Sequence, residues 1–317
     1  MADISLREAF GLALVDLARV RDDFVVLDGD VAGGTGTYHF KAAFPDRFYD
    51  FGIAEQNMMA AAAGIATTGL IPVVTTFAVF ATMRSLEQLR TFVAYPRLNV
   101  KVAGSHCGLD VGPDGATAQA LEDLAITRAV PNLTVVSPGD PIEMRLAVGA
   151  ILDHDGPVYL RTGRSPVPTV FPADHRFTIG RAQVLEDGDA VSIVASGVMV
   201  HRALAAAAML RREGLRARVV SCPTLKPLDV DLLVASAERT GAIVTAEDHS
   251  VIGGLGGAVA EALSEHCPVP ILRVGVRDRF GASGSPDALA KHYRIEADDI
   301  ATAARRLIRA KEARECA

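Results

Sequence analysis

Short apolar segments alternate with longer amphipathic ones along the chain, and this alternation predicts its fold. Five apolar runs in the first half are rich in β-branched residues and end at Gly, Pro or Asp, as buried strands do: 24–30, 71–77, 99–104, 133–138 and 156–162. Apolar positions between them predict helices at 5–20, 54–68, 82–93, 117–128 and 139–153. Asp140 is the expected N-cap of the last of these, before Pro141. Such alternation predicts a parallel sheet with helices on both faces.

The pattern changes at residues 165–180, a stretch with three prolines that is typical of an interdomain linker. The alternation then resumes, with strands expected at 190–197, 215–222, 241–248 and 270–276 and helices at 198–213, 229–238, 255–265 and 298–312. The chain is therefore predicted to be an α/β protein of two doubly wound domains. The first contains a parallel sheet and covers residues 1–170, and the second, smaller α/β domain covers residues 180–317.

Composition and charge narrow the class of protein. Of the 317 residues, 50% are hydrophobic, which is enough for two cores. The net charge is −6 and no Lys/Arg cluster is interleaved with aromatic residues, which argues against a nucleic-acid surface. No apolar run is long enough to span a membrane and no signal-peptide pattern is present, so we expect a cytoplasmic protein. The cysteines show no metal-binding spacing and are expected to be reduced thiols: Cys107, Cys222, Cys267 and Cys316.

Two glycine-rich stretches are candidates for phosphate binding. Residues 28–37 follow a strand, where open α/β sheets bind ligands, and a phosphate loop and a plain turn are equally compatible with them. Residues 252–263 fit neither GxGxxG with a downstream acid nor GK[ST]. Their glycines are predicted to form tight turns where helix and sheet approach closely: Gly253, Gly254, Gly256 and Gly257.

An acid in apolar surroundings is the first sign of chemistry. Glu55 begins a helix between the apolar "FGIA" and a run of alanine and methionine. The helix dipole would favour an acid there but does not explain the apolar residues before it. A carboxyl group so placed is suited to share a proton with a ring nitrogen. Phe77 and Phe80 are either core residues or the stacking wall for a flat heteroaromatic ligand.

A polar loop, residues 104–125, places His106, Asp110 and Asp114 within reach of one another. Asp114 is alternatively a helix N-cap. Adjacent residues of a strand point to opposite faces, so we do not expect His106 and Cys107 to act as a nucleophilic pair.

Three segments carry a family resemblance: "FPDRFYDFGIAEQNMMAAAAGIA", "PVVTTFAVFATMRSLEQLR" and "GPDGATAQALEDLA". They resemble the C-terminal half of a thiamine-diphosphate-dependent transketolase, most closely the separate small subunits found where that enzyme is split into two chains. The resemblance covers about residues 3–310. It implies a pyrimidine-binding domain at 1–170, a transketolase-like C-terminal domain at 180–317, and a transferase of carbohydrate metabolism that moves a two-carbon ketol unit.

The resemblance also implies roles for individual residues in cofactor binding. Glu55 would hydrogen-bond N1′ of the aminopyrimidine, and the cofactor would then serve as base and electron sink. Phe77 and Phe80 match the aromatic residues that lie against that ring, and Met83 stands where the family often has another aromatic. Asp30 matches an acid near the thiazolium and the subunit contact. The implied cofactor-binding set is Asp30, Ile53, Glu55, Phe77, Phe80 and Met83.

The implied substrate residues come from the loops. Arg7, His106 and Arg164 match groups that hold a sugar phosphate, for which arginine is suited, although both arginines could also be plain surface residues. Asp114 matches the acid that contacts a donor hydroxyl. The implied catalytic set is Glu55, His106 and Asp114. A serine that often helps to hold the phosphate has only a loose match, Gly34 or Thr35.

Two departures from the family pattern shape the functional hypothesis. Where the family has "DGxTHQ", this chain has "DGATAQ", so Ala118 replaces a histidine that contacts the donor sugar. A methyl group cannot hydrogen-bond, which favours a less usual ketose or ketose phosphate as donor. The metal-binding "GDG…N" motif is also missing. The diphosphate site and its Mg²⁺ are therefore expected from an N-terminal transketolase subunit, in an α₂β₂ hetero-oligomer.

Other functions remain compatible with the sequence. One alternative is a 1-deoxyxylulose-phosphate-synthase-like or 2-oxo-acid decarboxylating β subunit. Another is a non-catalytic binding or regulatory paralogue, which Ala118 favours and the intact Glu55, Phe77 and Phe80 oppose.

Overall fold

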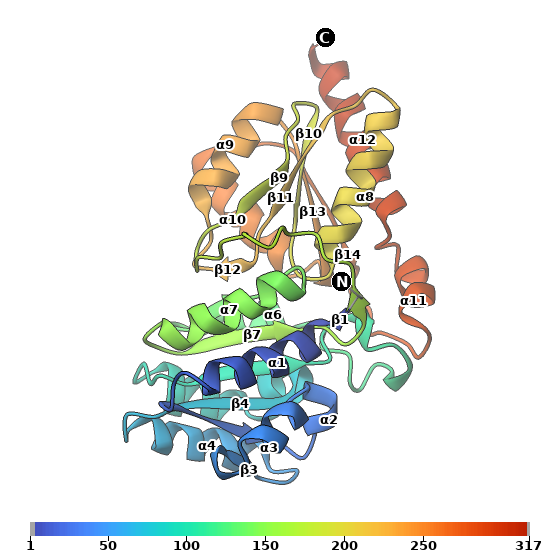
Figure 1. The fold of residues 1–317 in the computed structure, drawn as a ribbon. Coiled ribbons are helices and arrows are strands. Elements are labelled where there is room, and N and C mark those ends of the chain that lie inside the picture. The colour runs from blue at the N-terminus through green and yellow to red at the C-terminus, as the bar shows by residue number, and fades with distance from the viewer. Residues whose placement is uncertain (1–3, 316–317) are drawn as a thin grey trace.

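The computed structural model describes residues 4–315. They form two α/β halves, each a sheet flanked by helices, which lie one above the other in Figure 1. Cys316 lies outside the described residues. The first sheet has seven strands in the order β12-β6-β7-β5-β4-β2-β3. Its strands are β2 (Phe24–Asp28), β3 (Phe48–Asp50), β4 (Ile71–Phe77), β5 (Lys101–Ser105), β6 (Thr134–Val136), β7 (Val158–Thr162) and β12 (Thr224–Lys226). All neighbouring pairs are parallel except β12 with β6.

Helices cover both faces of this sheet. On one face pack α1 (Leu6–Ala18) and α7 (Pro141–Asp153), with Phe10, Leu14 and Met144 in a shared apolar core. On the other lie α4 (Glu55–Ala66) and α6 (Asp123–Ala129), with Met58 and Met59 in a second core. Shorter helices are α2 (Ala32–Thr35), α3 (Tyr38–Ala43) and α5 (Leu86–Gln88). The predicted parallel sheet with helices on both faces is confirmed.

The second sheet has five strands in the order β14-β13-β10-β11-β9. They are β9 (Gln183–Glu186), β10 (Val191–Ala195), β11 (Ala217–Ser221), β13 (Ile243–Ser250) and β14 (Ile271–Val276), of which only β9 pairs antiparallel. Its helices are α8 (Met199–Arg212), α9 (Val230–Thr240), α10 (Leu255–His266), α11 (Pro286–Tyr293) and α12 (Ala297–Glu315). Two α/β sheets in sequence confirm the predicted fold class.

The two halves are joined by strands that the sequence pattern did not predict. The expected linker contains β8 (Pro166–Val167), which pairs antiparallel with β1 (Ile4–Ser5). β12 follows the second domain's β11 yet completes the first sheet at its edge. These strands of two or three residues are too short to show an alternation of apolar and polar positions, so they can be recognised only from the strands with which they pair.

Two predicted helices are wrong in part. The segment 82–93 forms two π-helical stretches, Phe80–Arg84 and Leu89–Ala94, with α5 between them. The segment 117–128 is helical only from Asp123, after a 3₁₀ turn at Leu109–Asp114. Asp114 is therefore not an N-cap. By contrast, Asp140 caps α7 as expected and accepts the Glu143 N–H at 2.8 Å.

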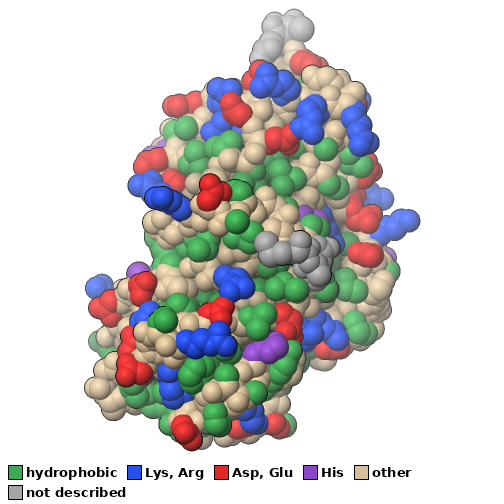
Figure 2. Space-filling view, viewed as in Figure 1, with side chains coloured by type: hydrophobic (Ala, Val, Ile, Leu, Met, Phe, Trp, Pro, Cys, Tyr) green, Lys and Arg blue, Asp and Glu red, His purple; other side chains and the backbone are tan. Residues whose placement is uncertain are grey.

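The surface in Figure 2 carries Lys/Arg and Asp/Glu side chains intermixed over both halves. Within residues 4–315, no helix has both the length and the apolar character to cross a membrane.

Candidate active site

Several of the predicted site residues lie together beyond the carboxyl ends of the parallel strands of the first sheet. The loop after β2 supplies Gly34, β4 ends at Phe77, and His106 follows β5. Arg164 follows β7, two residues after Thr162. This is where open α/β sheets bind ligands, because strand ends and the loops after them meet there.

Glu55 is the first residue of α4, and its side chain is only 2% exposed. The Arg84 guanidinium donates through Nη1 to both carboxylate oxygens, at 3.0 and 3.1 Å. Arg84 also lies over the Phe80 ring, 4.3 Å from its centroid, and is 47% exposed. A buried carboxylate is thus held by one arginine that reaches it from the surface.

Three rings form a continuous stack beside this pair. Phe77 lies 5.8 Å from Phe80, with 16° between the ring planes, and 3.8 Å from His106, with 22°. A Cβ atom on Gly34 would lie 2.7 Å from the Phe77 ring. The glycine therefore makes room for the stack, and the aromatic residues form a wall at the site.

His106 is buried at 3% exposure, in the left-handed region with φ of 62°. The Ser105 hydroxyl lies 3.0 Å from its Nδ1. Burial lowers the pKa of His106 to about 4, and the charges of Arg164 and Arg7 act in the same direction. The imidazole is consequently neutral near pH 7, where it can donate and accept hydrogen bonds.

Arg164, Asp114 and Arg7 surround that histidine. Arg164 donates to Asp114 at 3.1 Å and to the Val111 carbonyl, and Asp114 lies 3.9 Å from His106 Nε2. Arg7 donates to the Gly34 carbonyl at 3.2 Å. Its Nε is buried and has no hydrogen-bond partner among the described residues. Both arginines are partly buried and lie beside His106, and their role in the site stays a prediction.

The remaining predicted residues lie apart from this group. Ile53 is 77% and Met83 41% exposed, and Asp30 is exposed with φ of 61°. Among the described residues, none of these three forms a hydrogen bond to the others of the predicted set. Thr35 is buried and donates to Asp28 at 3.1 Å, so its hydroxyl serves the loop itself.

Sequence reasoning missed Arg84 and Asp28. Arg84 lies four residues after Phe80, a spacing at which a cation and a ring can meet on one helical face. Asp28, completely buried, accepts the Val31 N–H at 2.7 Å and the Thr75 hydroxyl at 2.7 Å. It holds together the loop 28–37, whose polar groups thus have internal partners.

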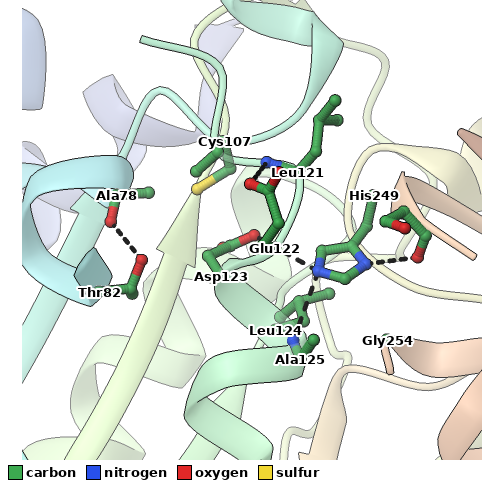
Figure 3. A network of polar contacts seen from close by, with 12 residues as sticks. Ala78, Thr82, Cys107, Leu121, Glu122, Asp123, Leu124, Ala125, His249 and Gly254 are labelled. Atoms are coloured by element: carbon green, nitrogen blue, oxygen red, sulfur yellow. Dashed lines mark hydrogen bonds and ion pairs between the residues drawn. The ribbon is translucent and has the colours of Figure 1, made fainter. Parts of the chain in front are cut away.

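A buried polar network joins the two halves next to the site, and Figure 3 shows its part around Asp123 and His249. Arg161 donates to Asp123 at 2.8 and 3.1 Å and to the Asp248 carbonyl at 2.8 Å. His249 lies against Asp123, at 3.9 Å. Burial alone would raise the pKa of Asp123, but Arg161 and His249 hold it below its ordinary value. Burial also raises the pKa of the neighbouring Cys107 thiol, which fits a packing role and not a nucleophile.

The second glycine-rich stretch closes over a buried acid. Glu247 accepts the N–H groups of Leu255 and Gly256 at the start of α10, at 2.7 and 2.9 Å. A Cβ atom on Gly254 would lie 2.0 Å from that carboxylate. Burial raises the pKa of Glu247 to about 7. The predicted close approach of helix and sheet is confirmed here.

Comparison with known proteins identifies the class that this fold and site define. Residues 2–169 match the transketolase pyrimidine-binding domain, and residues 180–300 match the transketolase C-terminal domain. The chain belongs to the transketolase family.

Several relatives are separate subunits of similar length. The 6-deoxy-6-sulfo-D-fructose transketolase subunit SqwH of Clostridium sp. is 42% identical over 98% of this chain and 96% of its own length. A subunit of the apulose-4-phosphate transketolase of Phocaeicola vulgatus is 38% identical over 94% and 95%. A solved split-gene transketolase, an inactive beta4 tetramer, is 49% identical with a TM-score of 0.89 over 97% and 99%. The human transketolase is 39% identical, and the match covers 49% of it.

Proposed function

We propose that this chain is the C-terminal subunit of a split, thiamine-diphosphate-dependent transketolase that transfers a two-carbon ketol unit between sugars or sugar phosphates. The observation that carries the proposal is the continuous series of contacts from Glu55 through Arg84, Phe80 and Phe77 to His106. These contacts bring a buried acid, a wall of aromatic rings and a neutral imidazole together at the carboxyl ends of the parallel strands.

The residues fit the pyrimidine end of the cofactor. The Glu55 side chain is only 2% exposed, and its one described side-chain partner, Arg84, is 47% exposed. Binding of the ring would require Arg84 to move away from the carboxyl group. The Glu55 carboxyl group would then share a proton with the ring nitrogen, with Phe77 and Phe80 against the ring face. The bound cofactor supplies an electron sink for cleavage of the ketose. We assign the pyrimidine-binding domain to residues 1–170 and the C-terminal domain to 180–317.

The partner subunit is proposed to supply the diphosphate site and Mg²⁺, since the sequence lacks "GDG…N". Within residues 4–315, no group of three or more His, Cys, Asp or Glu side chains is arranged to hold a metal ion. Active sites would lie between chains in an α₂β₂ assembly. The relatives that are separate transketolase subunits support this arrangement.

The substrate is proposed to lie between Arg7, Arg164 and His106. The Arg7 Nε, which has no hydrogen-bond partner among the described residues, is a donor for a phosphate oxygen, and the neutral His106 can donate a hydrogen bond to the same phosphate. Asp114 would accept a hydrogen bond from a sugar hydroxyl. Ala118 is half-buried in the adjoining loop and presents only a methyl group. A less usual ketose as donor is in keeping with relatives named for sulfofructose and apulose phosphate.

The test is reconstitution with an N-terminal transketolase subunit, thiamine diphosphate and Mg²⁺, and assay of ketol transfer from a panel of ketoses and ketose phosphates. Glu55→Gln should lower kcat by about 10²–10⁴-fold without changing assembly. Glu87→Gln, which changes an exposed acid on α5, should leave kcat unchanged. Full activity of Glu55→Gln, or of the chain without the partner, would contradict the proposal. Unchanged donor preference in Ala118→His would contradict the assignment of Ala118.

A further inference from the structure

A cavity lies in the C-terminal half, between the edge strand β14 and helix α12. Its volume is about 300 Å³. Five arginines line it against a single acid, Asp299, and they come from β14, the loop after it, the end of α11 and α12: Arg273, Arg277, Arg279, Arg294 and Arg306. In Figure 1, α12 lies at the opposite end of the molecule from α4, which carries Glu55.

Among the described side chains, none of these five guanidinium groups lies within ion-pair distance of a carboxylate, although the charge of Arg273 acts to lower the pKa of the buried Glu247. Arg273 donates to the Val251 carbonyl at 2.9 Å, and Arg277 donates to the Arg273 carbonyl at 2.8 Å. Arg279 lies over the Tyr293 ring at 5.0 Å. These contacts position the side chains but give their charges no direct carboxylate partner.

Other arginines of the same half do have a carboxylate partner, whereas Arg212 and Arg216 are exposed and have none among the described residues. Arg305, also on α12, pairs with Glu213 at 2.8 Å. Arg218 and Arg239 both pair with Asp187, at 2.5 and 2.8 Å. The single acid in the cavity, Asp299, accepts the Glu296 N–H at the start of α12 at 3.0 Å, so one of its oxygens is already engaged.

Several positive charges without a carboxylate partner lie around this cavity, in a chain whose net charge is −6. Such a local positive potential attracts anions. Arginine presents a planar fork of donors that matches phosphate oxygens, and several forks around one cavity suit several phosphates. The volume corresponds to the smaller binding sites for organic ligands. Leu272 and Ala303 supply an apolar wall beside the charges.

We propose that this cavity binds a small molecule that carries two or more phosphate groups, such as a nucleoside polyphosphate or inorganic polyphosphate. The guanidinium groups hold the phosphates, and the binding does not depend on the proposed transketolase activity.

The test is calorimetric titration of the full chain with ATP, inorganic tripolyphosphate and adenosine at low ionic strength. We expect saturable binding of ATP or tripolyphosphate and none of adenosine. If ATP binds more tightly than tripolyphosphate, the cavity also recognises the organic part of the ligand. If the two bind equally, the phosphate groups alone account for the affinity. Arg294→Ser combined with Arg306→Ser removes two exposed side chains that line the cavity, and it should raise Kd at least ~tenfold.

The matched control is Arg212→Ser combined with Arg216→Ser, which removes the same charge from exposed positions outside the cavity. Its Kd should stay at the original value. The proposal is overturned if neither phosphate compound binds at millimolar concentration, or if both double variants lose the same affinity, since the loss would then report only overall charge.

Discussion

His106 shows how burial sets the chemistry of a side chain. An exposed histidine is partly charged near pH 6.5, whereas this one has its pKa lowered to about 4 by burial and by two arginines. Glu55 is also buried, but its carboxylate forms an ion pair with the arginine Arg84. The site thus combines a neutral imidazole with an ion pair whose outer member reaches solvent.

The lowered pKa of His106 predicts a pH dependence of stability. Between about pH 4 and 6.5 the unfolded chain binds the extra proton, so stability is complete above 6.5 and falls as pH decreases through this window. The contribution is about 3 kcal/mol at most. Urea unfolding of the original chain and His106→Gln at pH 4.5, 5.5 and 6.5 measures it.

The variant should lose less stability than the original chain as the pH decreases. His249, whose burial also lowers its pKa to about 4, contributes in the same direction in both proteins. Glu247, with a raised pKa, opposes both between about pH 4.5 and 7. Equal pH dependence of the two proteins would contradict a neutral His106 in the folded state.

At the scale of elements, one carboxylate fastens a helix and a connecting segment together. Asp140 Oδ1 accepts the Glu143 N–H as the N-cap of α7. Its Oδ2 accepts the N–H groups of Val170 and Phe171, at 2.8 and 2.9 Å. The proline-rich segment 165–180 is therefore held against the first domain and does not behave as a free linker.

Asp140→Ala should therefore cost more than the loss of an ordinary cap. A simple N-cap contributes about 1 kcal/mol, and two further charge-assisted hydrogen bonds bring the expected loss to about 2–4 kcal/mol. Ser285→Ala is the matched control, because Ser285 caps α11 through a single bond to Ala288 N–H. Urea denaturation should show the larger loss for Asp140→Ala. Similar losses would mean that the bonds to the connecting segment contribute little.

For the whole molecule, the relation of the two halves depends on buried polar groups. Arg161 on β7 neutralises Asp123 and also reaches the carbonyl of Asp248 on β13. Gly108, with φ of 68°, packs so closely against Asp248 that a Cβ atom would lie 2.3 Å from its carboxylate. The second half is thus fixed against the loop that carries His106.

Arg161→Met tests this connection. It leaves the Asp123 carboxylate buried without its cation, which should cost about 3–5 kcal/mol and loosen the contact between the halves. Calorimetry should show a lower Tm and a tendency toward two transitions. Arg128→Met also removes a contact between the halves, the bond to the Gly253 carbonyl, but at a more exposed position, and should cost less. An unchanged Tm for Arg161→Met would show that the ion pair adds nothing.

The sequence by itself determined the two α/β halves, most strands, and the acid and aromatic residues, since these follow from local periodicity and residue type. It did not show Arg84 against Glu55, Asp123 under Arg161, or the five arginines around one cavity. Those residues are separated along the chain, and only parallel strands and crossing helices bring them together. It also missed the short strands β1, β3, β8, β9 and β12 and the π-helical form of 80–94, because tertiary partners outweigh local preference in short or strained segments.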